Sequence, residues 1–141
     1  MNNCFDPNLT DAELRDMSSL ALAHVGDAVY ELLVRTYICG RGVLTSNALH
    51  NATVSYVSAG AQARAMQVIE PLLTEEELTV CRRGRNAHVN SVPHGASFGE
   101  YHAATGLEAL FGWLYLRGRR DRLGELFAAV MSGEDGNADA T

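Results

Sequence analysis

The sequence contains no lysine, and all eleven of its basic residues are arginines. Acidic residues number 17, so the formal net charge is -6 at pH 7. A chain with this charge repels phosphate groups on average. Any binding of nucleic acid must therefore depend on local clusters of arginine, and a uniformly basic nucleic-acid-binding protein is excluded.

Cysteine is also scarce, with only Cys4, Cys39 and Cys81 in the chain. Their number is odd and no pair has CxxC spacing, which argues against a disulfide framework and against a zinc site. The first ten residues lack the basic and apolar regions of a signal peptide. No apolar run is long enough to cross a membrane without charged residues. We expect a soluble protein of the reducing cytoplasm, without a membrane partner.

Hydrophobic residues make up 47% of the 141 residues and charged residues 20%. These values are typical of one globular domain with a substantial core. No segment alternates polar and apolar residues over the length of a strand, so we predict an all-α fold. Residues 1–131 are expected to form this single domain. Residues 132–141, which are small and acidic, are expected to form a disordered tail.

Capping signals predict where several helices begin. Thr10 with Glu13, and Thr74 with Glu77, have the spacing of a capping box, and Ser19 is the expected cap of the longest helix. The segment "VNSVPHGASFG", residues 89–99, is expected to form a loop because it contains a proline and two glycines. The expected helices span about 11–17, 20–40, 46–70 with a break near 55–58, 75–88, 100–118 and 120–131.

Two acidic residues stand within the most apolar helical segments. Asp27 follows Gly26 in "LALAHVGDAVYELLVR", and Glu108 lies in "ATGLEALFGWLYL" between Gly106 and Gly112. A buried carboxylate is costly to ionise unless it is paired or binds a metal ion. The two acids therefore either face solvent or an arginine, or they jointly hold a divalent cation. Oxygen ligands of this kind suit Mg²⁺.

Four segments in order resemble one family. "HVGDAVYELLVR" and "GLEALFGWLYL" resemble the signature segments of ribonuclease III catalytic domains, and "LHNATVSYVSAGAQARAM" and "EEELTVCRRGRNAH" resemble further segments of Mini-ribonuclease III. That form is short and lacks the double-stranded RNA-binding domain. The resemblance covers about residues 14 to 131.

The resemblance implies the all-helical ribonuclease III endonuclease fold and a homodimer. It also implies Mg²⁺-dependent hydrolysis of double-stranded RNA, leaving 5′-phosphate and 3′-hydroxyl ends, with precursor ribosomal RNA as the expected substrate. Whether a ribosomal protein takes part stays open. Asp27 and Glu108 match the acids that the family uses for catalysis and metal binding.

Three positions depart from the long-form enzymes, which carry further acids where this chain has Leu20, Ala23 and Thr105. Mini-ribonuclease III shares these losses. They imply a metal site with few protein ligands. Glu31, one turn after Asp27, is either a further contributor to that site or an ordinary exposed acid of the helix.

The densest arginine cluster is the expected RNA contact. It comprises Arg82, Arg83 and Arg85, followed by Asn86. Guanidinium groups present paired donors to phosphate, and duplex RNA is recognised mainly through its phosphates and 2′-hydroxyls. The alternative is that the arginines offset a helix dipole. The second cluster, "RGRRDR" at residues 117–122, is interpreted as solvated surface.

The sequence thus predicts an endoribonuclease. The alternative is a catalytically degenerate ribonuclease III-like module that binds RNA or assists ribosome assembly, and the missing acids favour it. A helical protein adaptor is a third hypothesis, but it leaves Asp27, Glu108 and the arginine cluster unexplained.

Overall fold

Hydroxyl side chains begin most of the helices in the computed structural model, which describes residues 3–43, 45–87 and 97–139. The side chain of each of five capping residues accepts a hydrogen bond from a backbone N–H of the first turn, which satisfies a donor that the helix itself cannot. These residues are Thr10, Ser18, Ser58, Thr74 and Ser97. Both predicted capping boxes are present, whereas the longest helix is capped by Ser18 and not by Ser19.

The helices follow in the order that the sequence predicts, and the described residues contain no strand. The all-α prediction is confirmed. The predicted break near Ser58 is also confirmed, since that residue ends α3 and caps α4. The elements are α1 (Asp11–Arg15), α2 (Ser19–Gly40), α3 (Ser46–Val57), α4 (Ala59–Ile69), the short η1 (Glu70–Leu72), α5 (Glu75–Arg85), α6 (Phe98–Leu116) and α7 (Arg120–Asp139). Most of the loop predicted over residues 89–99 lies outside the described residues, and its last two residues, Phe98 and Gly99, begin α6.

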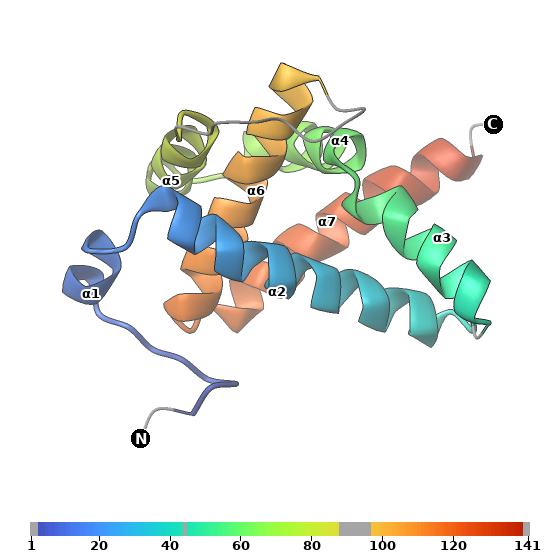
Figure 1. Cartoon of the computed structure of the whole chain (residues 1–141), viewed down its shortest axis with the longest axis horizontal. Helices are drawn as coiled ribbons and strands as arrows, with labels where there is room; N and C mark the ends of the chain where they lie inside the picture. Colours follow the sequence, from blue (N-terminus) through green and yellow to red (C-terminus); the bar gives the residue numbers. More distant parts are fainter. Residues whose placement is uncertain (1–2, 44, 88–96, 140–141) are drawn as a thin grey trace.

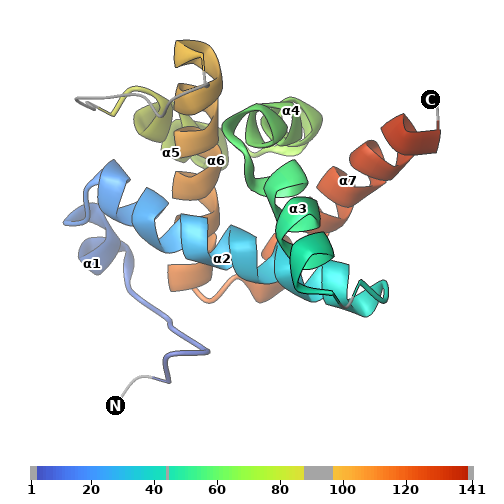
Figure 2. The ribbon, with the colours of Figure 1, turned by 45° about the vertical axis from the view of Figure 1, so that its right-hand side comes forward.

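Helix α6 is the centre of the fold, with α2, α4, α5 and α7 packed around it. Figures 1 and 2 show α2 crossing in front of α6, with α5 beside it and α7 passing behind. Leu107, Leu110, Phe111 and Leu114 of α6 are fully buried. Because apolar residues surround α6 on all sides along its middle, it is a core helix and not an amphipathic surface helix. Among the described helices, none is both long and apolar enough to cross a membrane.

The C-terminal prediction needs a correction. Residues 132–139 were expected to be disordered, yet α7 continues to Asp139. Gly133 lies against Val68 of α4, and Glu134 forms an ion pair with Arg64 at 3.6 Å. Contacts with a neighbouring helix favour extension of α7 beyond the last apolar residue of its sequence pattern, because each added residue extends a helix that already exists. That residues 1–131 act as a single catalytic domain stays a prediction.

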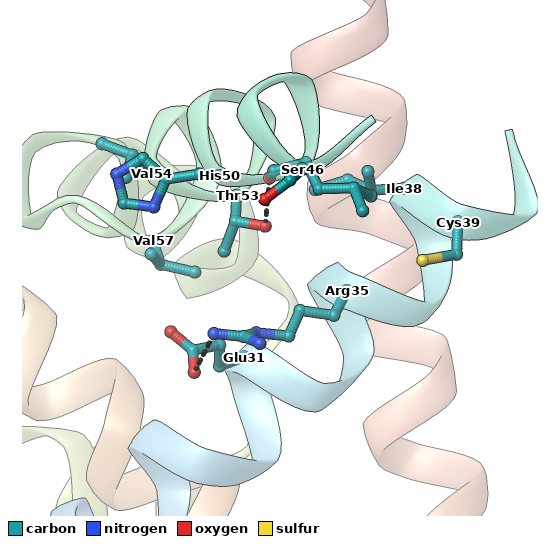
Figure 3. Close-up of a pocket in the computed structure, with 10 residues that line it drawn as sticks. Glu31, Arg35, Ile38, Cys39, Ser46, His50, Thr53, Val54 and Val57 are labelled. Atoms are coloured by element: carbon teal, nitrogen blue, oxygen red, sulfur yellow. Dashed lines mark hydrogen bonds and ion pairs between the residues drawn. The ribbon is translucent and has the colours of Figure 1, made fainter. Parts of the chain in front are cut away.

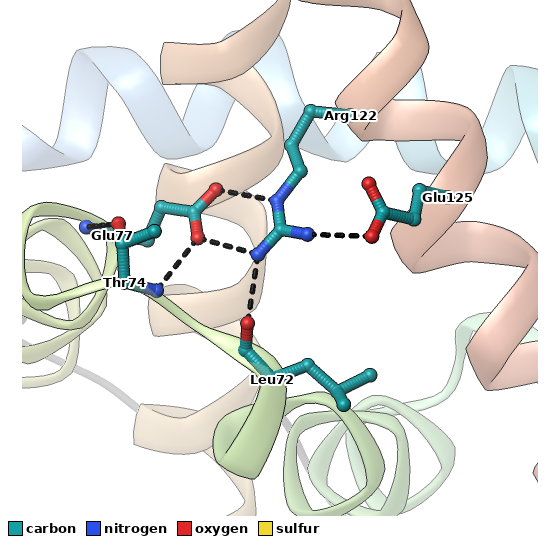
Figure 4. A network of polar contacts seen from close by, with 5 residues as sticks. All are labelled: Leu72, Thr74, Glu77, Arg122 and Glu125. Atoms are coloured by element: carbon teal, nitrogen blue, oxygen red, sulfur yellow. Dashed lines mark hydrogen bonds and ion pairs between the residues drawn. The ribbon is translucent and has the colours of Figure 1, made fainter.

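A buried ion pair joins α5 to α7 (Figure 4). Arg122 donates two hydrogen bonds to the Glu77 carboxylate, at 2.8 and 2.7 Å, and a third to the Leu72 carbonyl at 2.8 Å. Burial raises the pKa of Glu77, but hydrogen bonds from Arg122 and from the Thr74 backbone outweigh it and leave that pKa lowered. Such a bidentate pair is one of the stronger polar contacts available to a protein.

Replacing Arg122 by methionine should reduce the free energy of unfolding by about 3–5 kcal/mol, because it leaves the Glu77 carboxylate buried without its partner. Thermal or denaturant unfolding at neutral pH would measure the loss. Glu77 has a lowered pKa in the folded state, so the contribution of the pair is present above the unfolded pKa and disappears as pH falls through the folded value. The two proteins should therefore converge in stability in acid.

Arg120→Met is the matched control. Arg120 pairs with Asp6 at 3.1 Å, and both side chains are more than half exposed. Its loss should cost no more than about 1 kcal/mol. Equal effects of the two substitutions would contradict a special role for the Glu77–Arg122 pair.

Candidate active site

Two glycines allow α2 and α6 to touch backbone to backbone. A Cβ atom on Gly26 would lie 1.6 Å from the carbonyl oxygen of Glu108, and one on Gly112 would lie 2.0 Å from that of Leu22. No other residue fits at either position without moving a helix. The crossing therefore fixes α2 against the turn of α6 that carries Glu108.

Helix α5 packs on the same part of α6 in a similar way. A Cβ atom on Gly84 would lie 2.8 Å from Cβ of Ala109, and one on Gly106 would lie 2.9 Å from the Cys81 carbonyl oxygen. Glu108 is thus held between close contacts on both sides of its turn. The last turn of α5 is a direct neighbour of this segment.

The crossing brings the two predicted acids together. Asp27 follows Gly26 directly, and its side chain forms a hydrogen bond with the Glu108 side chain. Asp27 is exposed and Glu108 is partly buried. The two carboxyl groups therefore meet at the surface of the helix crossing, where a ligand could reach them.

The pKa of Glu108 is raised well above its ordinary value. Burial raises its pKa most, and the hydrogen bond to Asp27 and the negative charge of Asp27 raise it further, to about 8. A hydrogen bond from Gln62 acts in the opposite direction. Two carboxylates in contact cannot both ionise readily without a cation, so a proton occupies the position that a positive charge would otherwise fill.

The two carboxylates fit Mg²⁺, which needs few protein ligands and retains several waters. Within the described ranges no group of three His, Cys, Asp or Glu side chains is arranged to hold a metal ion. Two of the three positions where the long-form enzymes carry acids are otherwise engaged, since Ala23 is buried and the Thr105 hydroxyl donates to the Tyr101 carbonyl at 3.0 Å, and the third, Leu20, cannot bind a cation. Any cation bound here would rest on Asp27 and Glu108.

Glu31 points into a groove between α2 and α3, one turn after Asp27 (Figure 3). It forms an ion pair with Arg35 at 3.2 Å. The groove has a volume of about 520 Å³, and its α3 side includes His50 and Val57. Its arginine partner makes Glu31 an ordinary helix-surface acid in this structure, and a role at the metal site stays a prediction.

The predicted RNA-contacting residues end α5. Arg82, Arg83 and Arg85 form its last turn, Asn86 is its C-cap, and all four are exposed. None of the three arginines forms an ion pair with a residue in the described part of the chain. Their guanidinium groups are available to an outside anion, on the helix next to Glu108.

The second arginine cluster differs in this respect. Arg117 pairs with Asp11 and Glu76, Arg120 pairs with Asp6, and Arg122 pairs with Glu77 and Glu125. Arg117 also stacks over the ring of Trp113, with its guanidinium carbon 4.5 Å from the ring centroid. Three of its four arginines therefore bind within the chain, and Arg122 is largely buried rather than solvated as the sequence suggested.

Comparison with known proteins identifies the family. The Ribonuclease III domain family matches residues 20–119. A Mini-ribonuclease 3 of Symbiobacterium thermophilum is 47% identical over 79% of this chain and 85% of its own. One from Brevibacillus brevis is 42% identical over 92% of this chain and 93% of its own. The chain belongs to the ribonuclease III family.

The comparisons also confirm the predicted fold and the likeness to the short branch of the family. A crystal structure of a protein from Fusobacterium nucleatum superposes with a TM-score of 0.79 at 30% identity, covering 86% of this chain and 98% of that one. The predicted resemblance to Mini-ribonuclease III is confirmed. As a ribonuclease III family member, the chain is an endoribonuclease that acts on RNA.

The sequence did not indicate the roles of two residues: Gln62, which lies beside the acid pair, and Arg122, which joins α5 to α7. Gln62 appeared only within a family-like segment, and Arg122 only within a basic cluster. The partners of Gln62 lie on α6 as well as nearby in sequence, and the partner of Arg122 lies on α5. No local pattern signals such contacts.

Proposed function

We propose that this endoribonuclease cleaves double-stranded RNA in a Mg²⁺-dependent reaction and matures the ends of precursor ribosomal RNA. The observation that carries the proposal is the hydrogen-bond contact of Asp27 with Glu108 at the glycine crossing of α2 and α6. A purely RNA-binding module has no need of two carboxyl groups held together at the cost of a raised pKa.

Asp27 and Glu108 would hold the cation through their carboxylate oxygens. When bound, the cation lowers the pKa of water and neutralises charge on the phosphodiester. The protein contributes the fixed spacing of its two acids, set by backbone contact. We propose that the products carry 5′-phosphate and 3′-hydroxyl ends, as in the family.

Cleavage of a generic RNA duplex by the purified protein tests the proposal. We expect cutting with Mg²⁺, no cutting with excess chelator, and 5′-phosphate products that a phosphate-dependent exonuclease degrades. Salt-sensitive binding without cutting, on both a generic duplex and a precursor ribosomal RNA duplex, would favour the degenerate RNA-binding module and contradict the proposal. Cutting of the precursor duplex alone would narrow the substrate, and addition of ribosomal proteins to that assay would reveal any requirement for one.

We also propose that Arg82, Arg83 and Arg85, with Asn86, bind the RNA backbone. Changing Arg82 and Arg83 to glutamine should weaken binding of duplex RNA. It should also reduce the slope of a plot of log affinity against log salt concentration, by about 0.9 for each phosphate that the protein no longer neutralises. Filter binding over a range of salt concentrations measures the slope. Arg117→Gln, in the ion-paired cluster, is the control and should leave the slope unchanged. An unaltered slope in the double variant would remove these residues from the RNA surface.

A homodimer is part of the proposal. Leu32 is 63% exposed and Phe5 75% exposed, and with Val25 and Val29 they line one hollow of about 640 Å³. Large apolar side chains grouped at a surface favour association with a partner. A symmetric dimer would present two acid pairs to the two strands of one duplex. Light scattering that gave a monomer mass at micromolar concentration would contradict it.

Cation binding should release a proton, because the cation replaces the one that Glu108 holds. With the pKa of Glu108 at about 8 in the metal-free protein, Mg²⁺ affinity should rise as pH rises toward that value and then level off. Calorimetry in buffers of different ionisation enthalpy should detect about one proton released per cation near pH 7 and none near pH 9. If the number of protons released per cation were the same near pH 7 and near pH 9, the result would contradict displacement of a proton from Glu108.

A further inference from the structure

Gln62 is a buried polar residue next to the acid pair. It lies in the second turn of α4 (Ala59–Ile69), and its side chain is 2% exposed. Helix α4 packs along α6, the helix that carries Glu108. A fully buried amide is uncommon and calls for partners that satisfy its two donors and its oxygen.

The amide nitrogen of Gln62 donates a hydrogen bond to the Val57 carbonyl at 3.2 Å. The amide also acts on the Glu108 side chain, where it lowers the pKa of the carboxyl group, and a hydrogen-bond donor to the ionised form has this effect. The Val57 carbonyl can only accept, so it fixes which end of the amide is the nitrogen. Gln62 therefore links the junction of α3 and α4 to the Glu108 carboxyl group.

The amide oxygen of Gln62 has no partner. Among buried side-chain nitrogen and oxygen atoms in the described residues, Oε1 of Gln62 alone makes no hydrogen bond. A buried acceptor without a donor destabilises a fold by about 1–3 kcal/mol. An apolar side chain of the same length would avoid this loss. The hydrogen bond to the Val57 carbonyl offsets part of this cost, and the contact with Glu108 supplies a further reason for glutamine at this position.

We propose that Gln62 is a positioning residue that holds the Glu108 carboxylate, through its amide N–H, in the orientation that binds the divalent cation. This inference rests on the proposed function, in which Asp27 and Glu108 hold that cation. Gln62 does not touch the RNA or the cation; it acts through Glu108. Hydrogen bonds to a metal-binding side chain commonly contribute a factor of roughly 10 to 100 in metal affinity or activity.

Gln62→Met tests the assignment, because methionine keeps the length of the side chain and removes both donors. Mn²⁺ binding to the RNA-free protein, followed by electron paramagnetic resonance, should weaken by roughly 10- to 100-fold. The apparent KM for duplex RNA should stay unchanged while kcat falls at subsaturating Mg²⁺. The melting temperature should change little, since removal of the unpaired oxygen and loss of the bond to the Val57 carbonyl act in opposite directions. Gln67→Met, an exposed glutamine on the same helix, is the control and should change none of these values.

The possible results separate this inference from the proposed function. Wild-type protein that binds Mn²⁺ in an Asp27-dependent manner, with Gln62→Met binding equally well, would overturn the role of Gln62 alone. Wild-type protein that binds no Mn²⁺, or binds it equally well after Asp27→Asn, would overturn the metal site and Gln62 with it. A Gln62→Met protein that does not fold would make the amide a structural group and would also overturn the assignment.

Discussion

Asp27→Asn is expected to lower the rate of duplex RNA cleavage by about 10³-fold or more, equivalent to about 4 kcal/mol of transition-state stabilisation. Asparagine has the shape of aspartate but not its charge, so one of the two anionic ligands for the cation is lost. The side chain is exposed at the helix crossing, and the amide of asparagine can also form a hydrogen bond with Glu108. Folding and self-association should therefore be preserved.

The metal-free Asp27→Asn protein should be at least as stable as the wild type at neutral pH. Asp27 is a source of the raised pKa of Glu108, and its removal relieves repulsion between the two carboxyl groups. Single-turnover cleavage with Mg²⁺, thermal unfolding and light scattering together measure these effects. Glu31→Gln, one turn along the same helix, is the matched control and should keep most of the activity. Full activity of Asp27→Asn would remove Asp27 from the catalytic site.

Gly26→Ala is expected to destabilise the fold strongly, even though it adds a single methyl group. That carbon would lie 1.6 Å from the Glu108 carbonyl oxygen, so α2 and α6 must separate to admit it. Overpacking typically reduces the free energy of unfolding by about 1–3 kcal/mol. Because the contacting atom here belongs to the backbone and cannot move by a change of rotamer, we expect a loss at or above the upper end of that range. Denaturant unfolding gives the change in stability.

Gly26→Ala should also lose cleavage under conditions where the remaining protein is folded, because separating the helices moves Asp27 away from Glu108. Gly40→Ala is the control, on the same helix with no atom within 4 Å of the added carbon. It should change stability by no more than about 1 kcal/mol, since alanine is the better helix former. A Gly26→Ala protein with wild-type stability would contradict the close contact of the two helices.

Much of the fold could be predicted because helix signals are local. Thr10 and Thr74 each show their role within four residues of sequence, and both form the expected capping boxes. The placement of Ser18 as a cap instead of Ser19 is an error of one residue, in a stretch where two serines could serve equally well. The predicted length of α7 was too short. Its last turns contact α4, and the pattern of apolar residues along α7 gives no sign of that contact.

The acid pair could be anticipated, whereas its surroundings could not. Asp27 and Glu108 stood out because each interrupts an apolar helix next to glycine. Glu77 showed only a capping role in the sequence, and its second role as the partner of Arg122 depends on a residue 45 positions away. Gln62 is polar, in a helix with apolar neighbours, and nothing nearby in the sequence indicates that its amide reaches α6. Contacts between distant segments decide these roles.

The glycine crossing also determines which parts of the protein can be redesigned. The separation of Asp27 from Glu108 is set by main-chain atoms of α2 and α6 in contact, not by the shapes of the apolar side chains around them. Repacking the interface of α4 with α7 for thermal tolerance should therefore leave the spacing of the acids intact. A library that varies the apolar core while keeping Gly26 and Gly112 fixed should yield many active enzymes, and one that varies the two glycines should yield almost none.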